Sequence, residues 1–311
     1  MPQEHVIDPE RIHHAWDGSL EPTLRIAPGD TVHFDIRKAG HGQVEDGWPY
    51  ERAAFDFDTL YNLLGPVYVD GARPGDTLEV EIVELRPGAW GWCGVLPDLG
   101  LLPEDFPEPF LRYFDLTQGD TTELVPGVRI PVEPFLGTMG TLPDDVEHAT
   151  PFPPHKGGGN VDTRHLRTGT TLQLPVFREG ALFSCGDPHA AQGDGELCVA
   201  AIETDMHATL RFGLRRQTIS TPRFVVPGPL TPRTDAGGYY GTMGIHADLM
   251  QGAKEAARGM IELLGQEHGL AREDAYMLCS LAGDLKIFEI VDAGVWNVGL
   301  TLPRSVFGDP S

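Results

Sequence analysis

The stretch Arg73–Ile82 reads RPGDTLEVEI, and Ala27–Ile36 reads APGDTVHFDI. In both stretches Pro-Gly-Asp suits a tight turn in which the glycine takes a positive φ, and the threonine opens a strand. The residues that follow alternate between apolar and polar, which is typical of a strand with one buried face. We interpret the pair as a recurrent turn-to-strand unit. An internal duplication stays open as the alternative, because the match is short.

Glycine and proline interrupt the chain at short intervals over most of its length. The 311 residues include 38 glycines and 27 prolines, and short alternating runs lie between them. Short strands separated by regular turn signals are typical of β-sandwiches and β-barrels. Hydrophobic residues make up 41% of the chain, which is enough for a substantial core.

The C-terminal third has a different pattern. Ile245–Gly269 places apolar residues on one helical stripe, with Gly269 where a C-cap glycine belongs. A second helix is predicted at about Arg272–Ala282, and Leu285–Pro303 returns to strand-like alternation. The sequence therefore predicts a mainly β protein, with sandwich-like or barrel-like sheets and a small α/β C-terminal portion.

Three parts follow from this pattern. Residues 1–135 form a β-rich N-terminal part, 136–235 a β-rich part that holds the densest polar motifs, and 236–311 the α/β C-terminal part. The alternative is that all three form one compact unit. The tetrapeptide Gly-Thr-Met-Gly occurs at 137–140 and at 241–244, where its glycines would let backbone loops approach closely.

The chain is strongly acidic. It has 23 lysine and arginine residues against 46 aspartate and glutamate residues, a formal net charge of −23. Such a surface repels phosphate backbones and anionic lipids, so we expect neither nucleic acid nor membrane partners. The N-terminus lacks the basic and apolar regions of a signal peptide, and four cysteines without CxxC spacing favour reduced thiols. We therefore expect a cytoplasmic protein.

The densest polar stretch is Asp187–Glu196, which reads DPHAAQGDGE. Asp187 and His189 are two residues apart, the spacing that puts both side chains on one face of an extended segment. A carboxylate with an imidazole is a mixed O/N ligand set that suits Zn²⁺ and similar ions. The alternative from spacing alone is an Asx turn with a surface histidine. Further acids that could complete a metal site are Asp162, Asp194, Glu196 and Glu203.

Two segments frame this stretch. The segment 157–166, GGGNVDTRHL, comes before it and is followed by a predicted strand at Thr170–Val176. The segment Leu197–Glu203 comes after it and reads as an apolar strand, buried on both faces, that ends in a carboxylate. Carboxylates beside a buried strand are costly unless they are paired or bound to a cation, which favours a metal site.

Other catalytic apparatus is missing from the sequence. There is no P-loop lysine motif, no G-x-S-x-G elbow and no dinucleotide-binding G-x-G-x-x-G after a strand. Cys185 with His189 would make a nucleophile pair, but a cysteine in a strand is more typical of a small core residue.

Motifs over essentially the whole chain, in order, resemble the acetamidase/formamidase family. They include SLEPTLRIAPGDTV, GPVYVDGARPGDTLEVEI, IPVEPFLGTMGTLP, GGGNVDTRHL, LPVFREGALFSCGDPHAAQGDGELCVAAIET, PGPLTPRTDAGGYYGTMG and MLCSLAGDLKIFEIVDA. The resemblance implies hydrolysis of a short aliphatic amide to carboxylate and ammonia, a mainly β cytoplasmic homo-oligomer, and a divalent metal. The matching signature positions are Asn160, Asp162, Asp187, His189, Gln192, Asp194, Glu196 and Glu203.

These positions suggest a metal-assisted hydrolysis. Asp187 and His189 would hold the metal with help from Asp162 or Glu203, and His41 would complete the ligand set from a distant loop. The metal would activate a water, and Glu203 or Glu196 would act as general base and acid. Asn160, Gln192 and backbone N–H groups around Gly193–Gly195 would bind the oxyanion. The expected catalytic residues are Glu203, Glu196, Asp194, Asn160 and Gln192, and the expected metal ligands are Asp187, His189, Asp162 and His41.

Alternatives remain for the metal, the substrate and the class of protein. The mixed ligand set favours Zn²⁺, and Ca²⁺ stays the alternative because acid-rich loops bind it. A non-catalytic β-sandwich that binds a small ligand beside a structural Ca²⁺ is one rival, and a hydrolase of a larger, cyclic or urea-like amide is another. Trp90, Trp92 and Phe106 either line a pocket or pack in the core or a subunit contact.

Overall fold

The computed structural model describes residues 1–45, 56–145, 147–228, 238–290 and 294–308. Residues 229–237 and 291–293, which belong to two of the family motifs, lie outside the described residues, as does the predicted boundary between residues 235 and 236. The helices and main strands are β4 (Leu24–Ile26), β5 (Thr31–Ile36), β6 (Leu63–Val69), β7 (Thr77–Val95), β8 (Phe110–Asp115), β9 (Thr121–Val125), β10 (Val128–Pro131), β11 (Phe135–Thr141), β13 (Gly158–Asn160), β14 (Thr171–Pro175), β15 (Phe183–His189), β16 (Glu203–Arg215), β17 (Arg223–Val225), β18 (Tyr239–His246), α1 (Leu249–His268), α2 (Arg272–Ala282), β19 (Asp284–Glu289) and β20 (Trp296–Pro303). The short strands are β1 (Glu4–Val6), β2 (Ile12–His13), β3 (Trp16–Asp17) and β12 (His148–Ala149).

The two Pro-Gly-Asp-Thr stretches open strands β5 and β7, as predicted. Gly29 and Gly75 have φ of 101° and 93°, the left-handed backbone that glycine adopts without strain. In each turn the aspartate side chain accepts a hydrogen bond from the backbone N–H three residues earlier: Asp30 from Ala27 at 3.0 Å, and Asp76 from Arg73 at 2.9 Å. The shared sequence therefore builds the same turn twice.

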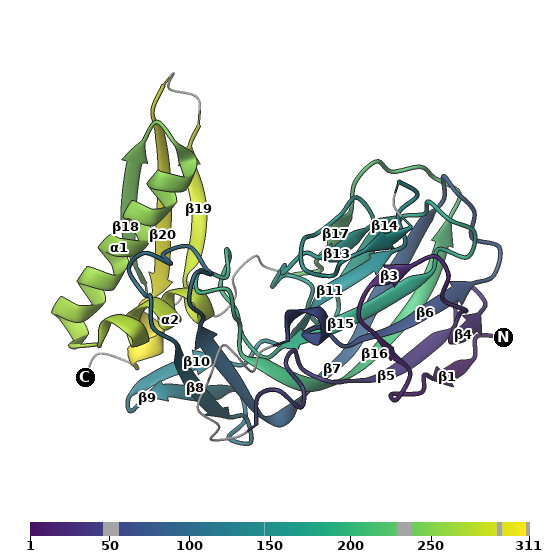
Figure 1. The fold of residues 1–311 in the computed structure, drawn as a ribbon, viewed down its shortest axis with the longest axis horizontal. Helices are drawn as coiled ribbons and strands as arrows, with labels where there is room; N and C mark the ends of the chain where they lie inside the picture. The colour runs from purple at the N-terminus through teal and green to yellow at the C-terminus, as the bar shows by residue number, and fades with distance from the viewer. Residues whose placement is uncertain (46–55, 146, 229–237, 291–293, 309–311) are drawn as a thin grey trace.

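Most of the strands form one large sheet, shown on the right of Figure 1. Its main path is β13-β11-β15-β16-β7-β14-β17, and the path does not close on itself, so the sheet is open. Strands β5 and β6 join it beside β16 and β15. Alternate residues of these strands meet in one buried cluster, for example Phe34 of β5, Val80 of β7 and Phe212 of β16. The predicted mainly β architecture is confirmed.

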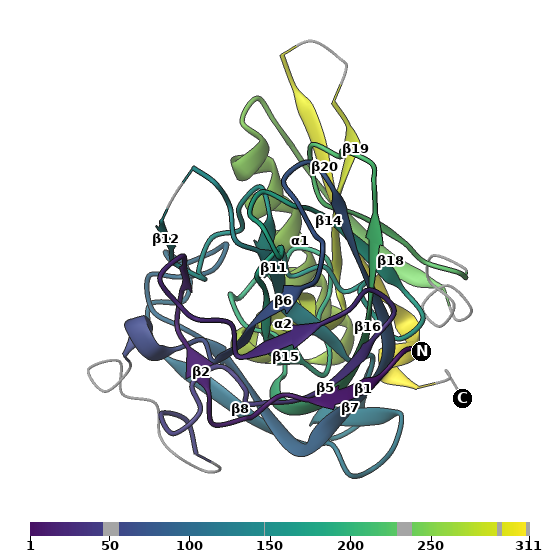
Figure 2. The same ribbon diagram turned by 90° about the vertical axis from the view of Figure 1, so that its right-hand side faces the viewer.

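Strand β7 links the large sheet to the C-terminal part (Figures 1 and 2). Thr77–Glu81 pairs with β14, and Trp90–Val95 pairs with β8. Trp92 and Phe106 are buried in a second cluster that includes residues of α1 and α2, and Trp90 packs against it. Of the alternatives for these aromatic residues, packing in the core is the one the structure shows.

The C-terminal part is a three-stranded sheet, β18-β20-β19, with α1 packed against it. Helix α1 begins four residues later than the predicted Ile245, because β18 continues to His246 and Asp248 caps the helix by accepting from the Gln251 N–H at 3.0 Å. It ends at Gly269, whose φ of 65° makes the predicted C-cap. Helix α2 has the predicted bounds, Arg272–Ala282.

One predicted element is wrong. Leu197–Ile202 is not a strand; it is a buried turn segment, and β16 begins only at Glu203. Glu196 and Val199 have φ of 43° and 72°, left-handed conformations that an extended strand cannot contain. The apolar composition of this segment reflects its burial against the rest of the chain, and burial alone does not select a strand.

Both Gly-Thr-Met-Gly stretches lie in strands, β11 and β18, instead of the predicted loops, but the second does allow close backbone approach. A Cβ on Gly244 would overlap the carbonyl oxygen of Gly252 in α1, whereas a Cβ on Gly241 would meet nothing within 4 Å.

We therefore expect Gly244→Ala to lower the free energy of unfolding by about 1–3 kcal/mol through overpacking. Gly241→Ala, in the same strand, is the matched control. Denaturant titration of both variants tests this, and equal effects would contradict it.

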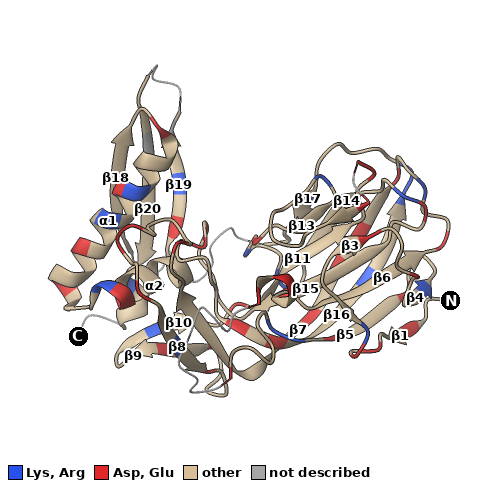
Figure 3. Cartoon of the chain, viewed as in Figure 1, with Lys and Arg blue, Asp and Glu red and all other residues tan. Residues whose placement is uncertain are grey.

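Acidic residues are spread over the large sheet and over the C-terminal part instead of gathering on one element (Figure 3). The four cysteines are free and buried. Within the described residues, no helix has the length and apolar character needed to cross a membrane.

Candidate metal centre and active site

Strand pairing brings three predicted site residues together. Strand β15 ends at His189, strand β16 begins at Glu203, and these two residues are register partners. His189 Nε2 lies 3.3 Å from Glu203 Oε2 and 3.3 Å from Asp187 Oδ1. Each of these three residues is at most 4% exposed. His189 is therefore not the surface histidine of the Asx-turn alternative.

A second group of possible ligands shares the same histidine. Asp162, His189 and Glu196 each offer an atom within 4.8 Å of the others, as do Asp187, His189 and Glu203. Asp162 follows β13, and Glu196 lies in the connection between β15 and β16. The imidazole of His189 is therefore shared by two groups of carboxylates, which come from four places: the segment after β13, β15, the β15–β16 connection and β16.

Three of these acids are held by unusual backbone. Asp162, Asp187 and Glu196 have φ of 39°, 54° and 43°, in the left-handed region that residues other than glycine seldom adopt. Asp187 also precedes a proline, which normally favours extended backbone. Strained conformations of this kind cluster at functional sites, where the surrounding structure maintains them.

The site has the properties of a cation site. Among the described residues, buried atoms without a hydrogen-bond partner include both ring nitrogens of His189, Asp162 Oδ1 and Glu203 Oε2. A Cβ on Gly137 of β11 would lie 2.5 Å from Asp162 Oδ1 and 2.8 Å from Asp187 Oδ2, so the absence of a side chain there leaves room beside the ligands. Buried acceptors without partners are costly, and a divalent ion would satisfy them. The carboxylate and imidazole donors are of the types that hold divalent ions in proteins.

The pKa values reflect the crowding of acids. Burial, together with the Asp187 carboxylate, raises the pKa of Asp162 to about 7, and burial raises the pKa values of Glu196 and Glu203. Burial lowers the pKa of His189, but the Glu203 and Asp187 carboxylates outweigh it and raise that pKa well above its usual value. The buried surroundings therefore favour the protonated forms of Asp162, Glu196, Glu203 and His189.

The predicted oxyanion donors lie beside the cluster, but most of them are engaged. Thr138 donates to Asn160 Oδ1 at 2.6 Å, and Asn160 Nδ2 donates to the Phe152 carbonyl at 3.2 Å. Gln192 Nε2 donates to the Asp162 carbonyl at 2.8 Å, while its Oε1 is buried without a partner. Their role as oxyanion donors stays a prediction.

The backbone expectation around Gly193–Gly195 needs a correction. The Gly193 N–H donates to the Ser280 carbonyl at 2.7 Å, and the Asp194 N–H donates to Asp284 Oδ1 at 3.3 Å. Both donors point to α2 and β19, because the segment 192–196 packs against the C-terminal part. They are therefore not free to bind an oxyanion.

Two other predicted residues are not in either ligand group. Asp194 Oδ1 lies 3.3 Å from Arg164 Nε and 3.6 Å from His165 Nε2. His41 is exposed, in the loop after β5. Within the described residues, the structure does not bring Asp194 or His41 to the His189 cluster.

Sequence reasoning missed the ion-pair network that holds the Gln192–Glu196 segment. Arg164 lies between Asp194 and Asp284, with Asp284 Oδ2 at 3.0 Å from its Nη2 and Glu133 Oε2 at 3.8 Å from its Nη1. The Leu285 N–H donates to the Asp194 carbonyl at 2.9 Å. Arg164 stands in the GGGNVDTRHL motif, but nothing in the sequence pairs it with an acid 120 residues later.

We expect Arg164→Ala to lower the free energy of unfolding by about 3 kcal/mol, because the nearly buried Asp284 carboxylate loses its closest cation and keeps Lys286, at 3.5 Å. Arg164→Lys, which keeps the charge, should recover part of this loss. Arg25→Ala, which breaks the exposed Arg25–Asp70 pair, is the matched control and should change stability much less, because solvent screens that pair. Denaturant titration measures all three, and an Arg164→Ala effect no larger than the control would contradict the expectation.

Comparisons with known proteins agree over the length of the chain. The profile of the acetamidase/formamidase family matches residues 2–147 and 145–309. An acetamidase of Mycolicibacterium smegmatis is 26% identical, with 71% of each chain covered. A formamidase of Methylophilus methylotrophus is also 26% identical, over 71% of this chain and 69% of that protein.

Solved structures show the same likeness. The crystal structure of an acetamidase from Bacillus halodurans is 30% identical, with a TM-score of 0.69 and coverage of 97% of this chain and 98% of that one. A gamma lactamase from Delftia acidovorans has a TM-score of 0.89 and covers 99% of this chain and 95% of its own. At 24% identity, the likeness to the lactamase concerns the fold alone.

Proposed function

The chain belongs to the acetamidase/formamidase family, and from this premise we propose that it hydrolyses a short aliphatic amide, of the size of formamide or acetamide, to a carboxylate and ammonia. The relatives named acetamidase and formamidase support an amidase that acts on linear amides. The observation that carries the proposal to particular residues is the buried Asp187–His189–Glu203 group.

We assign Asp187, His189 and Glu203 as the residues that would hold a divalent ion. They come from the paired strands β15 and β16, and each offers a ligand atom within 4.8 Å of the other two. The ring nitrogens of His189 and Glu203 Oε2 are buried without hydrogen-bond partners. When bound, such an ion supplies a positive charge that polarises an amide carbonyl and makes a water more acidic. The mixed O/N donor set supports Zn²⁺ as the proposed ion, with Ca²⁺ as the alternative.

We assign Glu196 as the general base and acid. It is half-buried on the segment between β15 and β16, whereas Glu203 is buried and has Oε1 bound to the Ala201 N–H at 3.2 Å. Its raised pKa suits a group that takes a proton and gives it back. As the water oxygen bonds to the carbonyl carbon, the water proton passes to Glu196. When the C–N bond breaks, that proton goes to the nitrogen, so that ammonia leaves.

The other polar residues orient these groups. Thr138 Oγ1 lies 3.5 Å from Asp187 Oδ2 while it also donates to Asn160, so Asn160 and Asp187 are tied through one hydroxyl. Gln192 connects the Glu196 segment to the Asp162 segment through a hydrogen bond to the Asp162 carbonyl.

We also propose, from the family resemblance, that the protein is a cytoplasmic homo-oligomer. Light scattering of the purified protein measures its oligomeric state.

Ammonia release from formamide, acetamide, propionamide and urea tests the proposed function. We expect turnover of formamide or acetamide that exceeds turnover of urea. A protein that binds metal but releases no ammonia from any of the four would contradict the proposal and favour the non-catalytic alternative. Turnover of urea alone would favour the urea-like alternative.

A further inference from the structure

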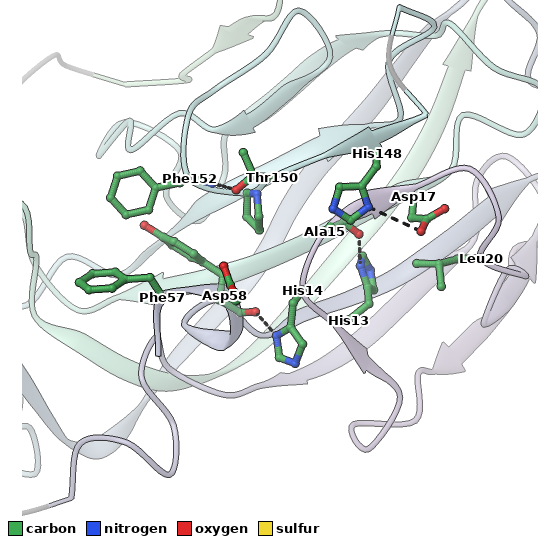
Figure 4. A pocket seen from close by; sticks show the side chains of 12 residues that line it. His13, His14, Ala15, Asp17, Leu20, Phe57, Asp58, His148, Thr150 and Phe152 are labelled. Atoms are coloured by element: carbon green, nitrogen blue, oxygen red, sulfur yellow. Dashed lines mark hydrogen bonds and ion pairs between the residues drawn. The ribbon is translucent and has the colours of Figure 1, made fainter. Parts of the chain in front are cut away.

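A large pocket lies next to the candidate active site. Its volume is about 410 Å³. Figure 4 shows Phe57 and Phe152 toward one end and Asp17, Leu20 and His148 toward the other. Tyr61, whose ring meets that of Phe152, belongs to the aromatic end with Phe57 and Phe152. His13 and His148 lie toward the other end, and His14 lies between the two ends (Figure 4).

Tyr61 connects this pocket to the cluster. Its ring lines the aromatic end and meets the Phe152 ring edge-on, with 6.0 Å between the ring centroids. Its hydroxyl oxygen lies 3.5 Å from Asn160 Nδ2, and Asn160 is joined to Asp187 through Thr138. Burial, together with the Asp187 and Asp162 carboxylates, raises the pKa of this hydroxyl well above its usual value. The ring of Tyr61 therefore lines the pocket, while its hydroxyl contacts Asn160 at the edge of the candidate site.

The size of the pocket exceeds what a one-carbon or two-carbon amide needs. Pockets of about 300–1,000 Å³ are those that enclose drug-sized ligands. The part next to the cluster is walled by aromatic rings, which pack well against another ring in edge-to-face or offset geometry. Asp17 and Asp58 also line the pocket, so it disfavours anionic groups. The complementary substituent is therefore apolar, uncharged and large enough to touch the rings.

We propose that the aromatic end of this pocket is an acyl subsite, and that the protein also hydrolyses primary amides whose acyl group carries an aromatic ring. This inference rests on the proposed function, because the reaction is the same: the C–N bond breaks, the water oxygen joins the carbonyl carbon, and carboxylate and ammonia result. The ring of the substrate lies among Phe57, Tyr61 and Phe152, and its amide lies at the cluster. Tyr61 and Phe152 are then specificity-determining residues.

Phenylacetamide and acetamide are the probes for this inference. We expect the wild-type protein to release ammonia from both. Phe152→Ala should raise KM for phenylacetamide about tenfold, because the ring contact is lost, and should leave KM for acetamide within about twofold. The Phe152 carbonyl that binds Asn160 remains in this variant. Phe224→Ala removes an exposed ring on β17, and as the matched control it should change neither KM.

The outcomes separate the subsite from the proposed function. If acetamide is hydrolysed while phenylacetamide is neither a substrate nor a competitive inhibitor, the subsite is wrong and the proposed function stands. Equal KM changes for both amides in Phe152→Ala would also overturn the subsite. If neither amide is hydrolysed, the proposed function fails, and calorimetric binding of phenylacetamide decides the subsite. Binding that is about tenfold weaker in Phe152→Ala supports it, and equal or absent binding overturns it.

Discussion

Replacing His189 by alanine is expected to abolish both metal binding and amide hydrolysis. His189 is the residue shared by both candidate ligand groups, and its Nε2 lies 3.3 Å from each of two carboxylates. Loss of even an outer partner of a metal ligand costs about 10- to 100-fold in affinity or activity, so loss of the ligand itself should reduce kcat/KM for acetamide more than about 100-fold. Steady-state kinetics and elemental analysis of the same sample measure the two effects.

His207→Ala provides the control for this substitution. His207 lies on the neighbouring strand, β16, and its Nδ1 lies 2.8 Å from Asp35 Oδ1 on a partly exposed face. We expect this variant to keep its metal and its activity. Circular dichroism of both variants shows whether the fold is retained. A folded His189→Ala protein with wild-type metal content and turnover would remove His189 from the site.

Replacing Glu196 by glutamine is expected to separate chemistry from metal binding. The amide side chain keeps the size of the carboxylate but cannot accept and return the proton, and general acid–base catalysis contributes about 10²- to 10⁴-fold. We therefore expect kcat to fall by about that factor while the metal content stays at the wild-type level. Glu203→Gln, in contrast, should lose metal and activity together, since Glu203 is assigned to the ligand group.

Glu81→Gln is the control for both glutamate variants, because Glu81 pairs with Arg211 on the outer face of β7, far from the cluster along the strand. It should leave kcat unchanged. If Glu203→Gln keeps its metal and loses kcat, while Glu196→Gln retains kcat, the two roles are reversed. Wild-type kcat in both glutamine variants would exclude a glutamate base at this site.

Local signals in the sequence were sufficient for much of the fold. Gly29 and Gly75 in the two Pro-Gly-Asp-Thr turns, and Gly269, have positive φ values that glycine adopts easily. The local sequence therefore predicts where strands β5 and β7 begin and where α1 ends. The run Leu197–Ile202 shows the limit of such signals. Its apolar residues are buried as expected, but the left-handed backbone at Glu196 and Val199 is imposed by tertiary contacts and has no local signature.

Local signals in the sequence likewise identify only some residues of the candidate site. Asp187 and His189 were found because they are two residues apart on a segment that forms a strand, and Glu203 because it follows an apolar run. Gly137 and Tyr61 were not assigned to the site, because they reach it only through the pairing of β11 with β15 and through the Asn160 contact. The contact of the Gln192–Glu196 segment with α2 and β19 likewise depends on folding of distant parts of the chain.

The most direct test of the metal-dependent account follows metal content and acetamide turnover on one sample of the wild-type protein, through chelation and then through re-addition of Zn²⁺. We predict about one ion per chain at full activity, a parallel loss of ion and turnover during chelation, and recovery of both when Zn²⁺ is returned. Full turnover in protein that contains no divalent ion would contradict the central claim that the Asp187–His189–Glu203 group works as a metal centre.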